Sequence, residues 1–227
     1  MRIALASDAT WRQAIVSARG RGAELICLPH LSFAPYVAAI RDRAGLENAE
    51  RSPSSLLVEA VECADGAWLA ASAYESEGEG VFYVTSYVTG PSGVTSSYRQ
   101  REVEASPGRY EQMFWSPGHG PHQVGETPLG PTGTLVGADL RSSVAWADLS
   151  SGGARIVLGG SSEPLELWQR TRRVVAGMAA AHGIAAFVVN RKDDRLGVQH
   201  PGGGGAFGVD GAELPPDGDG LYEIEAP

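Results

Sequence analysis

Residues 127–144 read TPLGPTGTLVGADLRSSV, and this stretch carries the clearest local structure in the chain. The residues from Thr134 to Val136 predict a strand. Gly137 follows at once, and glycine is the residue that permits a sharp turn at a strand end. The residues from Val144 to Leu149 then predict a short helix. The stretch is therefore expected to form a strand, a tight elbow and a helix, which is typical of an α/β fold.

The rest of the chain continues this alternation in both directions. Gly90-Pro91-Ser92-Gly93 is a turn sequence between two strand-like runs and predicts a β-hairpin. The predicted strands are Met1–Ala6, Ala23–Leu28, Ala67–Ala73, Val81–Thr89, Val94–Arg99, Thr134–Val136, Arg155–Leu158 and Ile184–Val189, and Ala206–Val209 is expected to begin a small final hairpin. The predicted helices are Asp8–Arg19, capped by Ser7 or Asp8, then Ser54–Ala64, Val144–Leu149 and Pro164–Ala181.

This order predicts one mixed α/β domain over residues 1–227, with helices covering the faces of the sheets. Residues 101–132 are rich in proline, glycine and histidine, and we expect a long loop there. A long loop in a compact domain is usually functional.

The composition excludes several classes of protein. Among 227 residues, 43% are hydrophobic and 20% charged, so a folded core is expected. The net charge of -9 argues against a nucleic-acid or anionic-membrane partner. No apolar run is long enough to span a bilayer, and the start of the chain does not resemble a signal peptide. We therefore expect a cytoplasmic protein that binds a small molecule without a cofactor.

Five segments in the right order resemble the nitrilase (carbon–nitrogen hydrolase) superfamily. GAELICLPH at Gly22–His30 is similar to the family pattern GADLVVFPE. Tyr36 corresponds to the tyrosine that follows this pattern in the family. The predicted hairpin leads into Tyr98-Arg99-Gln100, as the family hairpin leads into YRK. Residues 110–118 (YEQMFWSPG) are similar to YEKFYFTPG, and residues 127–144 align without a gap to TPLGKIGVLICYDLRFPE. Trp168 and Arg173, on a helix that leads to Val189-Asn190-Arg191, resemble the family's ending.

The resemblance implies a four-layer αββα sandwich that has lost its catalytic trio. In the family, a cysteine attacks the substrate carbon, a glutamate moves protons and a lysine holds the developing negative charge. The glutamate corresponds to His30, the lysine to Gln100 and the cysteine to Gly137. Neither Cys27, in a predicted strand, nor Cys63, in a predicted helix, is placed to replace that thiol. We therefore expect no thiol-dependent amidase or nitrilase.

The resemblance implies that one carboxylate of the family site is retained, because the second glutamate of the family corresponds to Glu111. His30 and Glu111 are our candidate catalytic residues, with Glu111 orienting the imidazole, because histidine suits acid–base work near neutrality. The alternative is a histidine that fills a decayed site and a structural carboxylate. The residues expected to contact a ligand are Tyr36, Gln100, Gly137, Ala138 through its backbone amide, and Arg141.

Several other features have a structural interpretation that competes with a functional one. Asp139 and Arg141 are expected to cap the helix that follows the elbow and to pair with residues within the elbow. The glycine run Gly202–Gly205 lacks the residues of a phosphate loop and predicts a flexible turn. His119 and His122 have metal-ligand spacing but no third ligand nearby, so we expect no metal.

Two function classes remain open. The first is a repurposed enzyme that uses acid–base chemistry for cyclisation, dehydration, elimination or isomerisation of a carbonyl, amide or imine. The second is a pseudoenzyme that acts as a binding or partner protein. An enzyme should show His30 and Glu111 at an open cavity, whereas a pseudoenzyme should show that cavity filled, for example by Met113, Phe114 or Trp115. Trp146 and Trp168 are expected in the core or at a homodimer interface near residues 144–149.

Overall fold

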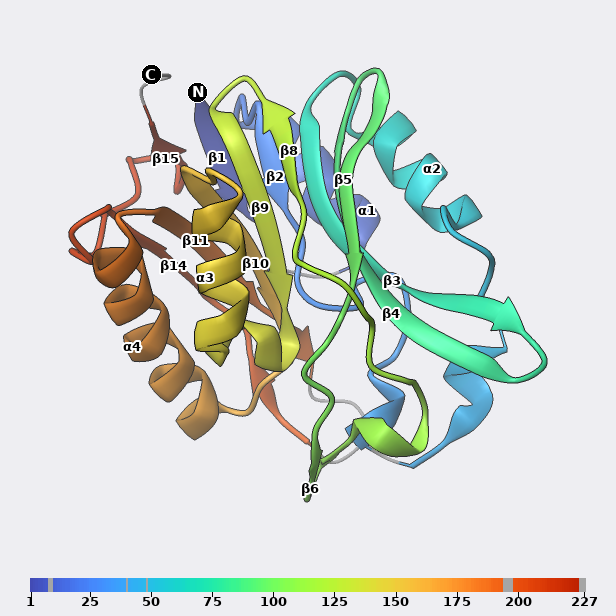
Figure 1. Cartoon of the computed structure of the whole chain (residues 1–227). Coiled ribbons are helices and arrows are strands. Elements are labelled where there is room, and N and C mark those ends of the chain that lie inside the picture. Colours follow the sequence, from blue (N-terminus) through green and yellow to red (C-terminus); the bar gives the residue numbers. More distant parts are fainter. Residues whose placement is uncertain (8–9, 40, 48, 194–197, 225–227) are drawn as a thin grey trace.

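The structure, a computed structural model, describes residues 1–227 except 8–9, 40, 48, 194–197 and 225–227. Two mixed sheets pack face to face, with two helices over the outer face of each (Figure 1). The first sheet has the order β15 (Tyr222–Glu223), β1 (Arg2–Leu5), β2 (Leu25–Cys27), β3 (Trp68–Gly78), β4 (Val81–Gly90) and β5 (Gly93–Arg99). The second has the order β14 (Gly204–Phe207), β11 (Ala185–Asn190), β10 (Ile156–Ser161), β9 (Gly130–Val136) and β8 (Val124–Thr127).

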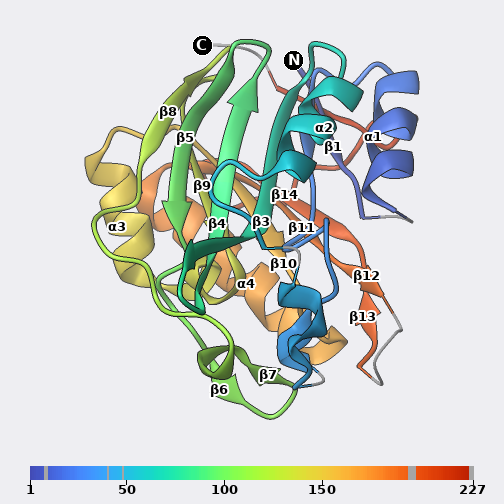
Figure 2. The same ribbon diagram turned by 90° about the vertical axis from the view of Figure 1, so that its right-hand side faces the viewer.

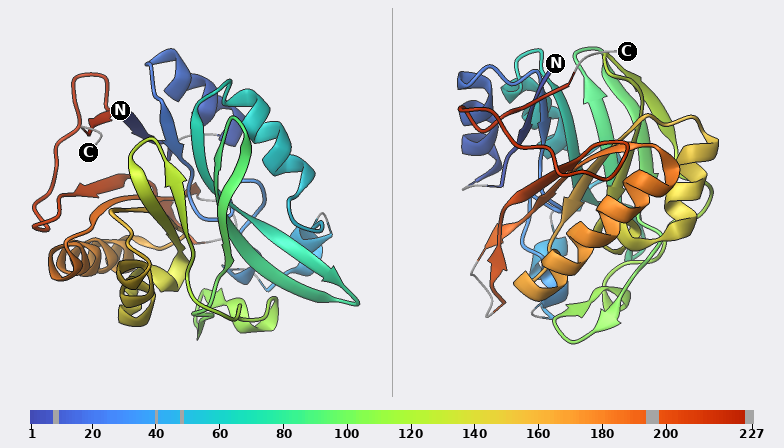
Figure 3. Two further views of the ribbon diagram at one scale, coloured as in Figure 1. Left: turned by 45° about the horizontal axis from the view of Figure 1, so that its top comes forward. Right: turned by 90° about the vertical axis from the view of Figure 1, so that its left-hand side faces the viewer.

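The helices complete a four-layer αββα sandwich, which confirms the predicted fold class. Helices α1 (Trp11–Gly20) and α2 (Ser55–Cys63) cover the first sheet (Figure 2). Helices α3 (Ser143–Ser151) and α4 (Leu165–His182) cover the second (Figure 3). No described helix has the length and apolar character that a membrane crossing requires.

The cap of α1 lies elsewhere than predicted. The helix begins at Trp11, and Thr10 caps it: the Thr10 hydroxyl accepts from the backbone of Gln13, whose side chain reaches back to the Thr10 backbone. This reciprocal capping box satisfies two amides that would otherwise lack partners. Ser7 as the cap was therefore wrong, and the alternative, Asp8, lies outside the described residues.

The segment 101–132 is more ordered than a loop. It contains β6 (Ala105–Ser106) paired with β7 (Arg109–Tyr110), the short helix η3 (Glu111–Met113), and β8 at the edge of the second sheet. These elements have two to four residues each, too few for a periodic pattern to be visible in the sequence. The loop prediction was wrong for these residues.

The glycine run is likewise not a simple flexible turn. Gly204 and Gly205 belong to β14, which pairs antiparallel with β11. A Cβ on Gly204 would lie 2.6 Å from Leu5 Cδ1, so glycine is required where β14 passes the first sheet. The expected final hairpin is reduced to one bridge between Phe207 and Glu213.

The topology brings several strand ends to one edge of the sandwich. Strands β9, β10 and β11 are parallel, and so are β1, β2 and β3. Strand β5 runs in the same direction as β3, because both are antiparallel to β4. A Cβ on Gly160, in β10, would lie 2.8 Å from the backbone nitrogen of His30, so the ends of β2 and β10 meet across the two sheets. This edge carries the site.

Candidate functional site

Gly137 marks the centre of the site, at the start of the short helix η4 (Gly137–Arg141). Its φ of +57° is the left-handed conformation that favours glycine. A Cβ built on it would lie 2.9 Å from Gln100 Nε2 and 3.5 Å from His30 Cε1. The ends of β2, β5 and β9 thus bring together the three positions that the sequence comparison had matched to the family trio.

Gln100 fills the space in front of Gly137. Its Nε2 donates to the Glu102 carbonyl at 2.8 Å and to Glu111 Oε2 at 3.0 Å. Both partners are acceptors, so the orientation of the amide is unambiguous. Gln100 is fully buried, and within the described residues its Oε1 and the Nε2 of His30 have no hydrogen-bond partner. The side chain is therefore fixed by Nε2 alone.

Glu111 is the most heavily bonded carboxylate of the site. It accepts from the Tyr36 hydroxyl at 2.7 Å, from Gln100 Nε2 and from the Glu104 backbone at 3.0 Å. Burial nevertheless raises its pKa to about 7, against the lowering effect of these three donors. Among the described hydrogen bonds, none joins Glu111 to His30. Glu111 orients Tyr36 and Gln100, which differs from its expected role of orienting the imidazole.

His30 is 1% exposed, and its backbone is held from another strand. Its carbonyl accepts from the Ser162 hydroxyl at 3.0 Å. Burial and, to a lesser extent, the positive charge of Arg191 lower the pKa of the imidazole to about 3, although contact with the Gln100 amide acts in the opposite direction. The imidazole is therefore neutral at physiological pH.

The three central side chains are buried. Gln100 and Glu111 are at most 2% exposed, like His30, and the cavities described near α1, α2, α4 and residues 101–117 are lined by other side chains. A cavity of about 230 Å³ near the start of α1 is lined by Pro29 and Ser32, on either side of His30 in the chain, and by Arg191. Of the aromatic and sulfur side chains expected to fill an inactive site, Phe114 and Trp115 are buried, whereas Met113 is 55% exposed.

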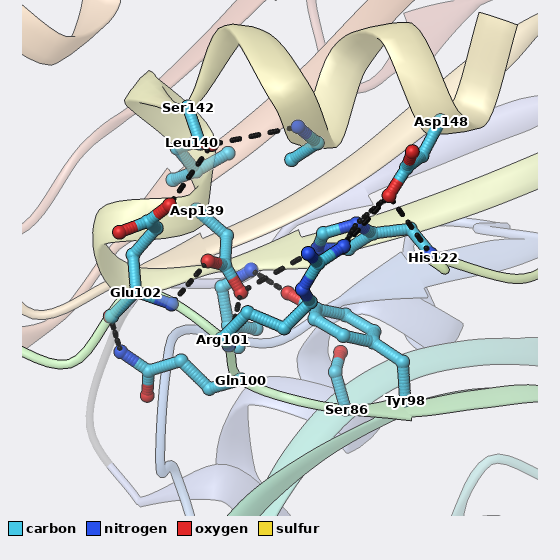
Figure 4. Close-up of polar contacts among 12 residues, drawn as sticks. Ser86, Tyr98, Gln100, Arg101, Glu102, His122, Asp139, Leu140, Ser142 and Asp148 are labelled. Atoms are coloured by element: carbon cyan, nitrogen blue, oxygen red, sulfur yellow. Dashed lines mark hydrogen bonds and ion pairs between the residues drawn. The ribbon is translucent and has the colours of Figure 1, made fainter. Parts of the chain in front are cut away.

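Asp139 ties the elbow to the segment that follows Gln100 (Figure 4). Its carboxylate accepts from the backbone amides of Arg101 at 3.0 Å and Glu102 at 2.7 Å. The cap of α3 is instead Ser142, whose hydroxyl accepts from the Ala145 amide. Asp139 as a helix cap was wrong, because its carboxylate is buried and turned toward the neighbouring loop.

Arg141 is engaged in ion pairs. Its guanidinium contacts Glu163, the Glu104 carboxylate at 3.0 Å and the Thr171 hydroxyl at 3.0 Å. These bonds connect the elbow to α4 and to the segment before β6. Pairing within the elbow was therefore wrong, since the partners of Arg141 come from other elements. Ala138, also proposed as a ligand contact, is buried beside Gly137.

The two histidines of the 101–132 segment diverge. His122 is buried, with Nδ1 at 3.1 Å from Asp148 and its ring 4.7 Å from that of Tyr98 (Figure 4), whereas His119 is exposed. Across the part of the chain that the structure describes, no group of three potential ligands is arranged to hold a metal. His122 instead takes part in the network around Asp139, from which its Nε2 lies 3.7 Å away.

Sequence reasoning missed Arg191 and His200 as parts of this region. Arg191 was noted only as a landmark, although it follows a predicted buried strand directly, which is a position typical of site residues. His200 had no recognisable signal. It reaches Tyr36 because β13 (His200–Pro201) pairs with β12 (Lys192–Asp193) beside the site.

The chain has the four-layer αββα fold of the carbon–nitrogen hydrolase (nitrilase) superfamily. The model of the carbon–nitrogen hydrolase family matches residues 8–194, so the chain belongs to that family. No curated protein matches the chain.

Solved structures with the same fold include three that differ in kind. A carbon–nitrogen hydrolase from Helicobacter pylori G27 has a TM-score of 0.80 at 17% identity, covering 97% of this chain and 87% of its own. A mutant amidase from Nesterenkonia sp. AN1, in which acrylamide has added to the active-site cysteine, has a TM-score of 0.78 at 19% identity, covering 100% and 94%. A glutamine-dependent NAD+ synthetase from Acinetobacter baumannii has a TM-score of 0.75 at 19% identity, covering 99% and 44%. At these identities the likeness concerns the fold.

Proposed function

We propose that this chain is a non-catalytic member of the carbon–nitrogen hydrolase family that acts as a binding or partner protein. In this proposal His30, Gln100 and Gly137 replace the glutamate, lysine and cysteine of active relatives. One observation carries the proposal: the Gln100 amide lies 2.9 Å from where a side chain at position 137 would begin. Gly137 itself carries no side chain, and the end of the Gln100 side chain would have to move to admit one. Burial also raises the pKa of Cys27, which disfavours the reactive thiolate.

The electrostatics of His30 support the same proposal. An effective general acid or base has a pKa near the working pH. With a pKa of about 3, His30 is a weak base, and almost none of the imidazolium form that would act as a general acid is present at neutral pH. Its side chain is also almost fully buried, which limits the access of a substrate. A hydrogen-bonding or structural role fits these properties better than proton transfer.

Ammonia release from a panel of amides and nitriles tests the proposal. We expect none above the rate of a Cys27→Ser, Cys63→Ser double variant, and no covalent adduct on either residue that depends on substrate. The same purified protein, denatured and extracted, can be searched for small molecules by mass spectrometry. Ammonia release that disappears in the double variant would show that a thiol does catalyse, and the proposal would be wrong.

A second candidate is an enzyme that uses acid–base chemistry without a thiol. The observation in its favour is Glu111, a buried carboxyl whose pKa of about 7 suits proton transfer near neutrality. The chemistry would be cyclisation, dehydration, elimination or isomerisation of a carbonyl, amide or imine. If a substrate is found, Glu111→Gln should lower turnover by about 10²–10⁴-fold. Unchanged turnover in both Glu111→Gln and His30→Ala would exclude this candidate.

We also propose a homodimer formed through the outer faces of α3 and α4. Val144 and Leu165, at the starts of these helices, are 55% and 53% exposed and give this face an apolar character. Trp146, part of the expected interface region, is fully buried within its own subunit, and so cannot contribute. The absence of a nucleic-acid partner remains a proposal that rests on the net charge of -9, and a cytoplasmic location remains a proposal as well.

A further inference from the structure

The backbone that follows His30 is strained, and it is held by Ser72 of β3 and by Arg191, which directly follows β11. Leu31 has a φ of +55°, a left-handed conformation that costs a residue with a Cβ about 1–2 kcal/mol. Its amide donates to the Ser72 hydroxyl at 2.8 Å. Its carbonyl accepts from Arg191 Nη1 at 3.0 Å, and the same nitrogen donates to the Ala34 carbonyl at 2.9 Å. Strain of this kind persists only where the surroundings fix it.

Arg191 also reaches, through Asp193, another buried histidine of this region, His200. Its Nε and Nη2 lie 3.2 and 3.1 Å from Asp193, which stands opposite His200 in the pairing of β12 with β13. The His200 ring packs edge-on against the Tyr36 ring, with 6.0 Å between the ring centroids, and the centroid of the His30 ring lies 5.9 Å from that of the same tyrosine. One guanidinium therefore connects the turn after His30 to the strand pair that carries His200.

Both histidines lie in the field of this guanidinium. Burial lowers the pKa of His30 and of His200, and for both groups Arg191 is the next cause in size. Asp193 acts in the opposite direction on His200, as the Gln100 amide does on His30. Within the part of the chain that the structure describes, the titratable or charged groups around the two imidazoles include Tyr36, Glu111, Arg191, Asp193 and the other histidine.

We propose that Arg191 is the positioning residue of this site: it clamps the turn that carries His30 and places a permanent positive charge beside both histidines. Arginine keeps its charge at every pH at which proteins are folded, and its fork can bond two segments at once. Arg191 thereby holds His30 as a neutral imidazole with one donor and one acceptor. This role is the same whether the site only binds a ligand or also turns one over, so it stands apart from the proposed function.

Histidine-selective isotope labelling and NMR titration of the full chain test this role. The chain has five histidines, which single His→Gln variants assign. In the wild type, His30 should stay neutral down to about pH 4. In Arg191→Met the titration midpoint of His30 should rise by about one pH unit, because a nearby positive charge has been removed. Arg155→Met, an exposed arginine at the opposite end of β10, should leave it unchanged.

Arg191→Lys separates the charge from the clamp. Lysine keeps the positive charge but not the bidentate geometry. The titration midpoint of His30 should stay low. Hydrogen exchange at the Leu31 amide should become about tenfold faster, because the turn loses the guanidinium hydrogen bonds to the carbonyls of Leu31 and Ala34. This variant also serves if Arg191→Met does not fold. A His30 midpoint that does not move in folded Arg191→Met, or a Leu31 amide that is equally protected in Arg191→Lys, would overturn the proposal.

Discussion

Adding one methyl group at Gly137 should destabilise the protein through two separate effects. The φ of +57° costs an alanine about 1–2 kcal/mol in backbone strain. The new Cβ would also lie 2.9 Å from Gln100 Nε2 and would displace that amide. Gln100 would then lose bonds to the Glu102 carbonyl and to Glu111, each worth about 0.5–1 kcal/mol.

Together these effects predict a loss of about 2–4 kcal/mol in the free energy of unfolding for Gly137→Ala. A chain of this size changes its Tm by about 2–4 °C per kcal/mol, so the Tm should fall by roughly 5–15 °C. Urea unfolding followed by circular dichroism measures the free energy directly. Gly183→Ala is the matched control, because Gly183 has a similar φ of +64° but open space where a Cβ would be.

A double-mutant cycle with Gln100→Ala isolates the contact. In that background Gly137→Ala should lose only its backbone term, so the two substitutions should couple by about 1–2 kcal/mol. Equal losses for Gly137→Ala and Gly183→Ala, or additive effects of Gly137→Ala and Gln100→Ala, would refute the idea that Gln100 occupies the space of a side chain at 137.

Three further predictions concern acid stability, the thiols and assembly. Because the folded pKa of His30 (about 3) lies below its ordinary 6.5, the unfolded chain takes up a proton first as the pH falls, and stability is lost between pH 6.5 and 3. The free energy of unfolding, measured with urea, should therefore fall less in His30→Gln than in the wild type as the pH is lowered. The difference should be roughly 2 kcal/mol at pH 5. The pKa of Glu111 is shifted in the opposite direction, from 4.5 to about 7 in the folded protein, so its contribution to the free energy of unfolding declines as the pH rises from 4.5 to 7. Glu111→Gln should therefore gain stability relative to the wild type as the pH is raised through this range. The Cys27→Ser, Cys63→Ser double variant should bind any ligand found by mass spectrometry as the wild type does, and weaker binding would contradict the absence of thiol chemistry. Light scattering should give a dimer mass for the wild type and a lower mass for Val144→Glu, and a wild-type monomer would count against the proposed interface.

The sequence alone was sufficient for the arrangement of long elements and for the fold class. The hairpin from Val81 to Arg99 and the strand, elbow and helix around Gly137 are determined locally, by side-chain periodicity and by the backbone freedom of glycine. Shorter elements were not predicted from the sequence. The cap at Thr10 was missed in favour of a polar residue closer to the strand, and β8 was missed because four residues show no period.

Only the tertiary structure decided how the site residues relate to one another. Gln100 and Gly137 are 37 positions apart, and nothing local indicates that the amide of one fills the side-chain space of the other. The partners of Glu111 are Tyr36 and Gln100 because the ends of β2 and β5 and the start of η3 meet at one edge of the sandwich. Arg191 gains its place beside His30 in the same way. Residue type follows from sequence, but burial, hydrogen-bond partners and the resulting pKa values depend on contacts that form only when distant strands pack together.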